Sequence, residues 1–338
     1  MAGEKELKDE TIRSRIVMNV LLIDADSKIP NLALMKLSTY YKGIGANISL
    51  VRLNLSYYPT RKRVYYVVPP GYDKIFCSVI FLESYNYILH DNNVEFGGTG
   101  YSLSKELPNE IELLEPDYSL YGDNDVSYGF ISRGCIRNCS FCFVPRKEGT
   151  IHQVNSINNI VRHNKTMFMD NNFLALPNHK ELLQELVDKK IKCQFNQGFD
   201  IRLIDNENSL LLSKLKYLGN YIFAFDSWSY ISLVDKKLEL LDWRKPWQLK
   251  FFVYCNPEMT ISETINRLNY LRDNCCLPYL MRDISCWESD KKHFYTDLAA
   301  WCNQPNLFKK MLFRDFLYKR HPKNKERQQS SYKIYLSK

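Results

Sequence analysis

The hydrophobic positions in the first hundred residues form short apolar runs and one longer segment with helical spacing. Residues 17–24 are a continuous apolar run, which is typical of a buried strand. Residues 31–42 have apolar side chains at helical spacing and stop at Gly43, a pattern that predicts the end of a helix. Further strand-like runs cover residues 47–53, 74–81 and 94–96. Strands that alternate with helices predict a parallel, doubly wound α/β domain over residues 16–115.

A second series of strand-like and helical segments begins near Val126. The strand-like runs lie at residues 166–170, 192–197, 221–226, 249–255 and 278–284, with helical stretches at 179–190, 208–219 and 262–274. About six β/α units of this kind predict a partial (β/α)6 barrel over residues 126–290, and 101–127 would connect it to the first domain. The active site of such a barrel lies at the carboxyl ends of the strands. Here the strands end in Asp170, Gln197, Asp226 and Asn256.

A third region, residues 291–338, is predicted to be helical and basic. The formal net charge of the chain is +8, and residues 305–338 hold the whole excess, with ten Lys or Arg against two Asp or Glu. The aromatic residues among them are Phe308, Phe313, Phe316, Tyr318, Tyr332 and Tyr335. Such a mixture suits phosphate contacts and base stacking, so nucleic acid is one expected partner. The alternative is a solvated terminus whose aromatic side chains pack on the barrel.

The apolar runs are too short for a membrane span, because none approaches ~18 residues. The first fifteen residues are polar and mixed in charge, and no apolar segment of a signal peptide follows them. We therefore expect a cytoplasmic protein without a membrane partner. Its ten cysteines would then lie in a reducing compartment, where clustered cysteines indicate metal or redox chemistry rather than disulfides.

Three cysteines stand close together in the segment ISRGCIRNCSFCFVPRKEG: Cys135, Cys139 and Cys142. Three thiolates on one loop can ligate three irons of a cubane [4Fe–4S] cluster and leave the fourth iron open for a small chelating ligand. Phe141 would shield one side of such a cluster, and Arg133 and Arg137 would add positive charge near it. A zinc ion is the alternative, but structural zinc takes four ligands, and His152 or His163 would have to be the fourth.

The Cys-x3-Cys-x2-Cys spacing, with an aromatic residue before the last cysteine, resembles the radical S-adenosylmethionine (SAM) superfamily. The resemblance covers residues 127–285 and includes the β/α pattern after the cysteines. It implies that the open iron binds the amino and carboxylate groups of SAM. An electron from the reduced cluster then cleaves SAM to methionine and a 5′-deoxyadenosyl radical. It also implies a reductant partner such as flavodoxin or ferredoxin, while the protein orients SAM and excludes side reactions.

The resemblance also assigns cofactor contacts. They are Phe141, Asp170, Asn171, Asn172, Arg202, Asp226 and Ser227. Residues 170–172 lie where the family binds the SAM amino group, often with a Gly-Gly-Glu sequence that is absent here; a plain turn is the alternative. Asp226 lies where related proteins carry a carboxylate that suits hydrogen bonds from the ribose diol. Arg202 would pair with the SAM carboxylate, unless it is a surface arginine.

The N-terminal domain is similar to the Rossmann-like, cobalamin-binding domain that precedes the barrel in one branch of the superfamily. The similarity lies in the strand order, in Ser78 and in the paired Gly97 and Gly98, since glycines permit close approach to a ligand. The cobalt-ligating Asp-x-His-x-x-Gly sequence is absent, because Asp26 stands for the histidine and Ile29 for the glycine. Some members bind cobalamin without this histidine. A scaffold or substrate-facing domain is favoured, and a cobalamin-dependent methyltransferase stays an alternative.

The remaining cysteines bear on two further hypotheses. The radical SAM methylthiotransferases of tRNA and ribosomal protein bring three more cysteines in their N-terminal domain, but only Cys77 precedes the motif here. Four later cysteines could hold an auxiliary cluster. They are Cys275, Cys276, Cys286 and Cys302. The adjacency of the first two is awkward for paired ligands, so buried free thiols are the favoured interpretation.

The sequence therefore predicts a radical SAM enzyme that modifies an unidentified substrate, with a nucleic acid or nucleotide favoured over a peptide or metabolite. The alternative from another class is an iron–sulfur binding or regulatory protein. Its cluster would be structural, and the tail and Rossmann-like domain would bind a partner. Turnover of SAM distinguishes the two hypotheses.

Overall fold

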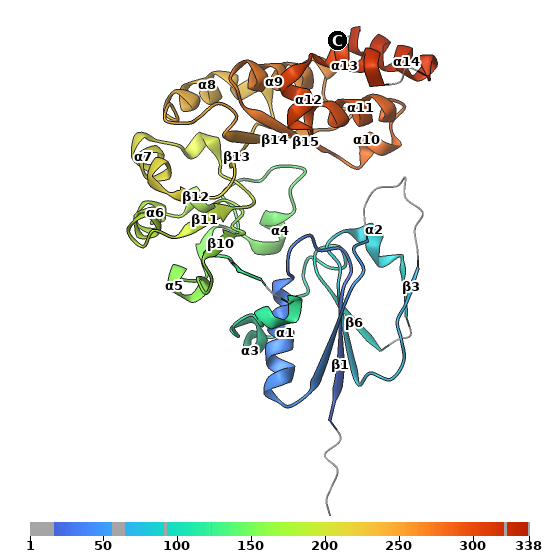
Figure 1. Ribbon diagram of the computed structural model, residues 1–338, viewed down its shortest axis with the longest axis vertical. Helices are drawn as coiled ribbons and strands as arrows, with labels where there is room; N and C mark the ends of the chain where they lie inside the picture. Colours follow the sequence, from blue (N-terminus) through green and yellow to red (C-terminus); the bar gives the residue numbers. More distant parts are fainter. Residues whose placement is uncertain (1–16, 56–64, 91–92, 123, 321–322, 337–338) are drawn as a thin grey trace, which may run out of the picture. The chain divides into compact units, whose positions relative to one another are not determined.

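The computed structural model describes residues 17–55, 65–90, 93–122, 124–320 and 323–336 (Figure 1). The chain divides into two compact units, one that ends at Asn124 and one that begins at Asp125. Both units contain parallel sheets with helices, which confirms the mixed α/β class expected from the sequence. Among the described residues, no helix combines the length and the apolar character that a membrane span needs.

The N-terminal unit is built on a parallel sheet with the strand order β2-β1-β4-β6. Its strands are β1 (Asn19–Asp24), β2 (Asn47–Arg52), β4 (Lys74–Ser78) and β6 (Val94–Gly97). Leu22 in β1 pairs with Leu50 in β2 and Phe76 in β4. The strands β1, β2 and β4 lie within the apolar runs of the sequence, and β6 extends its run by one residue, to Gly97. Because the strands are parallel, their carboxyl ends meet at one edge of the sheet.

Hydrophobic side chains are buried on both faces of this sheet. Successive side chains of a strand point to opposite faces, so neighbouring residues of β1 belong to different clusters. On one face Leu22 packs with Leu34 of α1 (Leu32–Gly43), and on the other face Ile23 packs with Phe96. The shorter elements of the unit are β3 (Tyr66–Val67), α2 (Leu82–Tyr85), β5 (Ile88–Leu89), α3 (Asn109–Glu112) and the 3-10 turn η1 (Tyr118–Tyr121).

The C-terminal unit contains a second row of parallel strands. They are β7 (Val126–Gly129), β10 (Lys165–Phe168), β11 (Lys192–Phe195), β12 (Lys216–Tyr217), β13 (Tyr221–Ala224), β14 (Leu249–Cys255) and β15 (Leu277–Arg282). Two sheets form, in the orders β12-β11-β10-β7 and β13-β14-β15. A parallel bridge between Phe199 and Phe223 joins them, so the longer strands follow one another as β7-β10-β11-β13-β14-β15.

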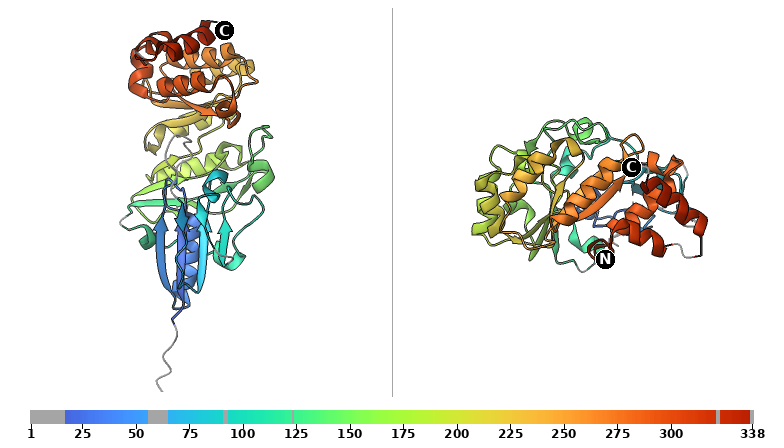
Figure 2. Two further views of the ribbon diagram at one scale, coloured as in Figure 1. Left: turned by 90° about the vertical axis from the view of Figure 1, so that its right-hand side faces the viewer. Right: turned by 90° about the horizontal axis from the view of Figure 1, so that it is seen from above.

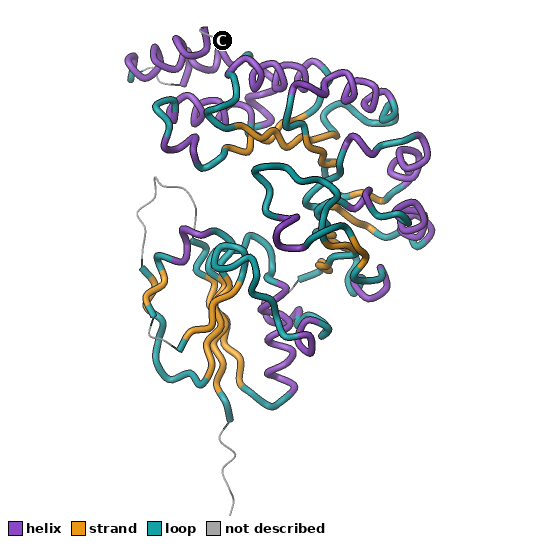
Figure 3. The backbone as a smooth tube through the Cα atoms, turned by 180° about the vertical axis from the view of Figure 1, so that it is seen from behind, coloured by secondary structure: helices purple, strands orange, loops and turns teal. Residues whose placement is uncertain are grey.

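Helices cover the outer side of this row, whereas α4 and the loop before it lie on the inner side (Figure 1, Figure 3). The inner helix α4 covers Val144–Glu148. The other helices are α5 (Ile157–Ile160), α6 (His179–Asp188), α7 (Asn206–Lys214), α8 (Ile231–Glu239) and α9 (Ile261–Asp273). Short elements are the antiparallel pair β8 (Ser132–Arg133) and β9 (His152–Gln153), and the 3-10 turns η2 (Phe173–Ala175), η3 (Ile201–Leu203) and η4 (Trp228–Tyr230).

The chain continues into a group of helices that pack together (orange to red in Figure 2). They are α10 (Ser285–Glu288), α11 (Lys292–Cys302), α12 (Pro305–Lys310), α13 (Phe313–Arg320) and α14 (Lys325–Leu336). Phe308, Phe313 and Phe316 are buried in the same hydrophobic cluster as the strands of the unit. These three side chains are therefore not available to stack on bases, although Tyr318 is 56% exposed.

A buried carboxylate joins three of these helices. Asp297 in α11 is fully buried and accepts hydrogen bonds from Arg320 Nε (2.7 Å) and Arg327 Nη2 (3.2 Å). The hydroxyl of Ser331 in α14 donates a third, at 2.9 Å. Burial of a charge requires such compensation, so these contacts fix α13 and α14 against α11.

Candidate functional site

The three clustered cysteines lie on one loop at the carboxyl ends of the strands in the C-terminal unit. The loop leaves the sheet after β7 and is closed at its base by the pairing of β8 with β9. Cys135, Cys139 and Cys142 are all half-buried. Gly134 has φ +82°, and a Cβ there would lie 2.2 Å from the carbonyl oxygen of Thr150. Only glycine fits this position, so the loop turns sharply just before its first cysteine.

Glu148, at the end of α4, holds this loop together. Its carboxylate accepts hydrogen bonds from Arg133 Nη1 (2.9 Å), from the backbone N of Gly134 (2.9 Å) and from Asn171 Nδ2 (2.7 Å). Sequence reasoning did not single out Glu148. A signal was present, because it is the only acidic residue between Asp125 and Asp170 in a segment with several positive charges.

Asp170, which follows β10, anchors the start of the loop from below. It is fully buried and accepts hydrogen bonds from the backbone N of Ile131 (3.2 Å) and from the backbone N and hydroxyl of Ser132 (both 2.6 Å). Burial raises the pKa of Asp170 to about 6, and these hydrogen bonds oppose the rise. Both oxygens of the Asp170 carboxylate therefore accept hydrogen bonds from the chain itself.

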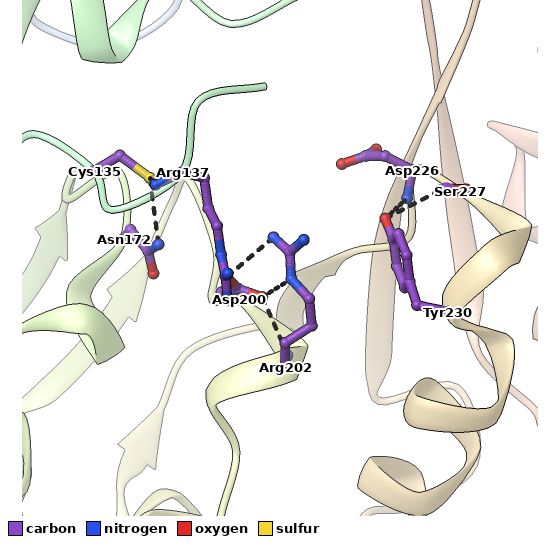
Figure 4. A network of polar contacts seen from close by, with 8 residues as sticks. All are labelled: Cys135, Arg137, Asn172, Asp200, Arg202, Asp226, Ser227 and Tyr230. Carbon is purple, nitrogen blue, oxygen red and sulfur yellow. Dashed lines mark hydrogen bonds and ion pairs between the residues drawn. The ribbon is translucent and has the colours of Figure 1, made fainter. Parts of the chain in front are cut away.

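Asn172 contacts the first cysteine directly. Its Nδ2 lies 3.3 Å from Cys135 Sγ, and the backbone N of Arg137 donates to the same sulfur at 3.3 Å (Figure 4). The Oδ1 of Asn172 is buried and has no hydrogen-bond partner among the described residues. N–H donors to a sulfur suit a thiolate that ligates a metal cluster, and an unpaired buried oxygen suits a ligand that can donate to it.

The thiols of the other two cysteines, Cys139 and Cys142, have raised pKa values. Burial raises the pKa of Cys139, the carboxylate of Asp226 raises it further, and Arg202 lowers it. Burial likewise raises the pKa of Cys142. Within the described ranges no group of three or more His, Cys, Asp or Glu is arranged around a single ion. A cubane cluster instead takes one thiolate for each iron, and bound iron would itself favour the thiolates.

A carboxylate between two arginines lies next to the loop (Figure 4). Asp200 accepts hydrogen bonds from Arg137 Nε (2.8 Å), Arg202 Nε (2.6 Å) and Arg202 Nη2 (3.0 Å). Burial acts to raise the pKa of Asp200, but the two arginines outweigh it and hold that pKa below its ordinary value. Arg202 thus lies beside the cysteine loop, and its Nη1 makes none of these contacts.

Asp226 and Ser227 end the next strand of the row. The phenol oxygen of Tyr230 accepts hydrogen bonds from the backbone N of Asp226 (2.7 Å) and of Ser227 (3.0 Å). The Oδ1 of Asp226 accepts from the backbone N of Tyr254 at 3.1 Å. Figure 4 shows that the Asp226 carboxylate points toward the side on which the Arg202 guanidinium lies. Burial raises the pKa of Asp226, with Arg267 and Arg202 lowering it.

Arg267 holds the strand ends on which Asp226 lies. It is fully buried in α9, and its Nη1 donates to the carbonyl oxygens of Phe225 and Tyr254, both at 2.9 Å. Burial lowers the pKa of this guanidinium. Sequence reasoning missed Arg267, although it lies three residues after Thr264 on the apolar face of a helix, where a charged residue needs an explanation.

Phe141 links the cysteine loop to the far strands of the row. Its ring stacks on Tyr254 with 3.9 Å between centroids and an angle of 14° between planes. The Tyr254 hydroxyl in turn donates to Asp283, just after β15, at 2.8 Å. Phe141 is 42% exposed, so one part of the ring is free to contact a ligand.

Comparisons with known proteins bear on this geometry. No family model matches the sequence, and no curated protein matches it. Its structure is similar to the solved structure of the radical SAM methyltransferase TsrM from Kitasatospora setae with tryptophan substrate and the SAM analogue aza-SAM bound. The two chains are 13% identical, and the match has a TM-score of 0.52 and covers 78% of this chain and 72% of that one.

The chain shares the fold of a radical SAM methyltransferase. This likeness confirms, at the level of the fold, the resemblance inferred from the cysteine spacing.

In the N-terminal unit, the polar residues at the strand ends bond to their own chain. Asp26 accepts from the backbone N of Ile80 (2.8 Å) and of Phe81 (2.9 Å), and burial raises its pKa. Gly98 has φ +91°, and a Cβ there would lie 2.3 Å from the carbonyl oxygen of Val79. This glycine thus permits close packing of the chain on itself. Gly97 has no atom within 4 Å of such a Cβ.

The later cysteines are spread over the last strands and helices of the C-terminal unit. Cys276, Cys286 and Cys302 are buried, whereas Cys275 is exposed. The Sγ of Cys286 lies 3.5 Å from the carbonyl oxygen of Cys255, which is the contact of a buried thiol. In the part of the chain that the structure describes, no group of three or more His, Cys, Asp or Glu surrounds a single ion. The auxiliary cluster stays a prediction from the sequence.

Proposed function

We propose that this protein is a radical SAM enzyme in which Cys135, Cys139 and Cys142 ligate a [4Fe–4S] cluster. The strands of the C-terminal unit would form the partial barrel around it. The observation that carries the proposal is the position of three cysteines on one loop, at the carboxyl ends of parallel strands, in a fold similar to that of a radical SAM methyltransferase. Such a cluster, when bound, supplies the electron for reductive cleavage of SAM.

The donors around the loop support this assignment. Cys135 Sγ already receives two N–H groups, from Arg137 and Asn172, and such hydrogen bonds stabilise the negative charge of a ligating thiolate. Glu148 fixes the start of the loop, just before Cys135, through its contacts with Arg133, Gly134 and Asn171. Asp170 acts as a positioning residue, because its carboxylate is spent on Ile131 and Ser132 rather than on a ligand.

The free polar atoms of the site match the three polar parts of SAM. We assign the amino group of SAM to the unpaired Oδ1 of Asn172, and the SAM carboxylate to Nη1 of Arg202, which Asp200 holds in place. The ribose hydroxyls are assigned to the Asp226 carboxylate, whose Oδ1 is fixed by Tyr254. Ser227 and Asn171 flank these groups, and Phe141 covers one side.

Iron content tests the ligands. Anaerobic reconstitution of the full chain should give about four irons per chain and a brown chromophore that dithionite bleaches. The Cys135→Ala, Cys139→Ala and Cys142→Ala triple variant should lose both. Cys275→Ala, which removes an exposed cysteine from outside the loop, should keep the full iron content. A triple variant with about four irons would refute the proposed ligands.

Turnover tests the enzyme as distinct from a protein with a structural cluster. The reduced, reconstituted protein should produce 5′-deoxyadenosine from SAM, measured by chromatography. Asp226→Ala should weaken SAM binding in calorimetry by about tenfold or more, because a hydrogen bond to a charged group contributes about 1.5–3 kcal/mol. Its iron content should not change, and Asp242→Ala, an exposed aspartate, is the matched control. Full iron content without SAM binding in the unaltered protein would instead favour the iron–sulfur binding protein.

A further inference from the structure

A cavity of about 490 Å³ lies in the C-terminal unit, apart from the cysteine loop. The residues that define its chemistry are Trp247, Asn269, Arg272, Asp273, Lys309 and Tyr335. Trp247 precedes β14 and Asp273 precedes β15, so the cavity lies at the amino ends of these strands. β14 has seven residues, which puts the cavity about 20 Å from the strand ends that carry the candidate SAM site. The cavity is a separate site.

Arg272 gives this cavity the character of an anion site. Its Nη1 is buried and has no hydrogen-bond partner among the described residues. The Arg272 side chain lines the cavity and makes no ion pair among the described residues, so its positive charge is available to an anion there. Lys309 stands at the rim with its Nζ 5.1 Å from the centre of the Trp247 ring. Two cations therefore face the cavity, against the single carboxylate of Asp273.

The backbone beside the cavity is held in an uncommon conformation. Trp247 has φ +68° and Cys275 has φ +52°, both in the left-handed region that residues other than glycine rarely adopt. The backbone N of Trp247 donates to the carbonyl oxygen of Cys275 at 2.6 Å. The strained pair places the Trp247 ring in the wall of the cavity, and strain of this kind is common at ligand sites.

The surroundings of the cavity suit a polyanion better than a single anion. Exposed basic residues also lie on and between α12, α13 and α14; they are Lys310, Arg314, Lys319, Lys323, Lys325 and Lys333. The two arginines that Asp297 neutralises are not among them. A chain of phosphodiesters would meet charge along its length, and aromatic rings at the cavity would lie beside a base.

We propose that this cavity binds one phosphate of a single-stranded nucleic acid, held by Arg272 and Lys309, while α12–α14 contact the neighbouring phosphates. The site is independent of the proposed enzymatic function, because it shares no residue with the candidate SAM site. Binding is therefore measured without SAM or reductant, and failure of one proposal leaves the other testable.

Point substitutions in the full chain test the site, since deletion of the last helix would remove Arg327 and Ser331 from Asp297. Arg272→Gln and Lys309→Gln each remove one charge, and Lys309 is exposed, so its variant should fold normally. Lys236→Gln makes the same change at an exposed site on α8. The measurement is the fluorescence anisotropy of a labelled single-stranded RNA of twelve nucleotides, over a range of salt concentrations.

We expect the slope of log affinity against log salt to become shallower by about 0.7 in each cavity variant, with unchanged slope for Lys236→Gln. Affinity at low salt should fall about tenfold for Arg272→Gln. Equal slopes in all three variants would overturn the site. Inorganic phosphate that displaces the RNA as well as unlabelled RNA does, phosphate for phosphate, would overturn the nucleic acid as its ligand. So would a phosphopeptide that binds more tightly than the RNA.

Discussion

Both units end their parallel strands in polar residues, but they treat these residues differently. In the N-terminal unit, Asp24 accepts from the Tyr121 hydroxyl (2.9 Å) and from the backbone N of Ser27 (3.0 Å), and Asp26 is bonded to the backbone after β4. In the C-terminal unit, Asn172 keeps a buried oxygen without a partner among the described residues, and the cysteines are half-exposed. Parallel strands thus end in polar groups that bond to their own chain in one unit, and next to an unpaired buried oxygen in the other.

The two units can be followed separately in solution. All five tryptophans lie between Trp228 and Trp301, so tryptophan fluorescence reports on unfolding of the C-terminal unit alone. Far-UV circular dichroism reports on both units. A variant at the strand ends of the N-terminal unit should therefore shift the circular dichroism signal alone. A variant at the strand ends of the C-terminal unit should shift both signals.

The largest effect is expected from Arg267→Met, which removes the guanidinium that bonds to the strand ends of the C-terminal unit. The carbonyl oxygens of Phe225 and Tyr254 would lose their donor, and Asp226 would lose a nearby positive charge. We expect the free energy of unfolding measured by tryptophan fluorescence to fall by about 3–5 kcal/mol. The exposed Arg314→Met should change it by less than about 0.5 kcal/mol. Similar values for the two variants would mean that the strand ends do not depend on Arg267.

The next effect depends on pH and concerns Asp170. In the unfolded chain this carboxyl ionises near 3.8, whereas in the folded protein its pKa is about 6. Between these values the folded state retains a proton that the unfolded state releases, so stability falls as pH rises. Relative to Asp170→Asn, the wild-type protein should lose about 2.4 kcal/mol between pH 4 and pH 7.

Denaturant titrations at several pH values, followed by tryptophan fluorescence, measure this difference. Asp242→Asn serves as the matched control for the change in charge. A constant difference between the wild type and Asp170→Asn across this range would show that Asp170 keeps an ordinary pKa in its buried position.

The smallest effect is expected at the strand ends of the N-terminal unit. Asp26→Ala removes the acceptor for the backbone N of Ile80 and Phe81, and should destabilise the N-terminal unit by about 2 kcal/mol. The circular dichroism transition should broaden or split, because only one unit is weakened. The tryptophan transition and the iron content after reconstitution should stay as in the unaltered protein. An equal shift in both signals would show that the two edges are coupled.

The sequence predicts the elements well where they are buried and regular. The apolar run at residues 17–24 became β1, whose last five residues are all buried. The strand-like runs at 192–197 and 249–255 became β11 and β14, in which buried positions alternate with less buried ones. The cysteine loop was evident from spacing alone. Helix α8 was missed, since its sequence ISLVDKKLE combines a short apolar stripe with charges.

The residues that organise the site were less predictable, because their roles depend on partners far away in sequence. Asp170 precedes two asparagines after a strand, and nothing local indicates that its carboxylate turns back to Ser132 while Asn172 turns to Cys135. Gly98 is similar, since a ligand and a close backbone neighbour require the same absence of a Cβ. Only the three-dimensional structure separates these two uses of a glycine.

Asp297 has a consequence for the order in which the chain assembles. During synthesis α11 leaves the ribosome before α13 and α14, so its carboxylate meets water before it meets Arg320 or Arg327. Docking α11 at that stage would bury a charge without its arginine partners, at a cost of several kcal/mol. Premature docking is therefore disfavoured, and the C-terminal helices should close over the last strands together, in a single cooperative step.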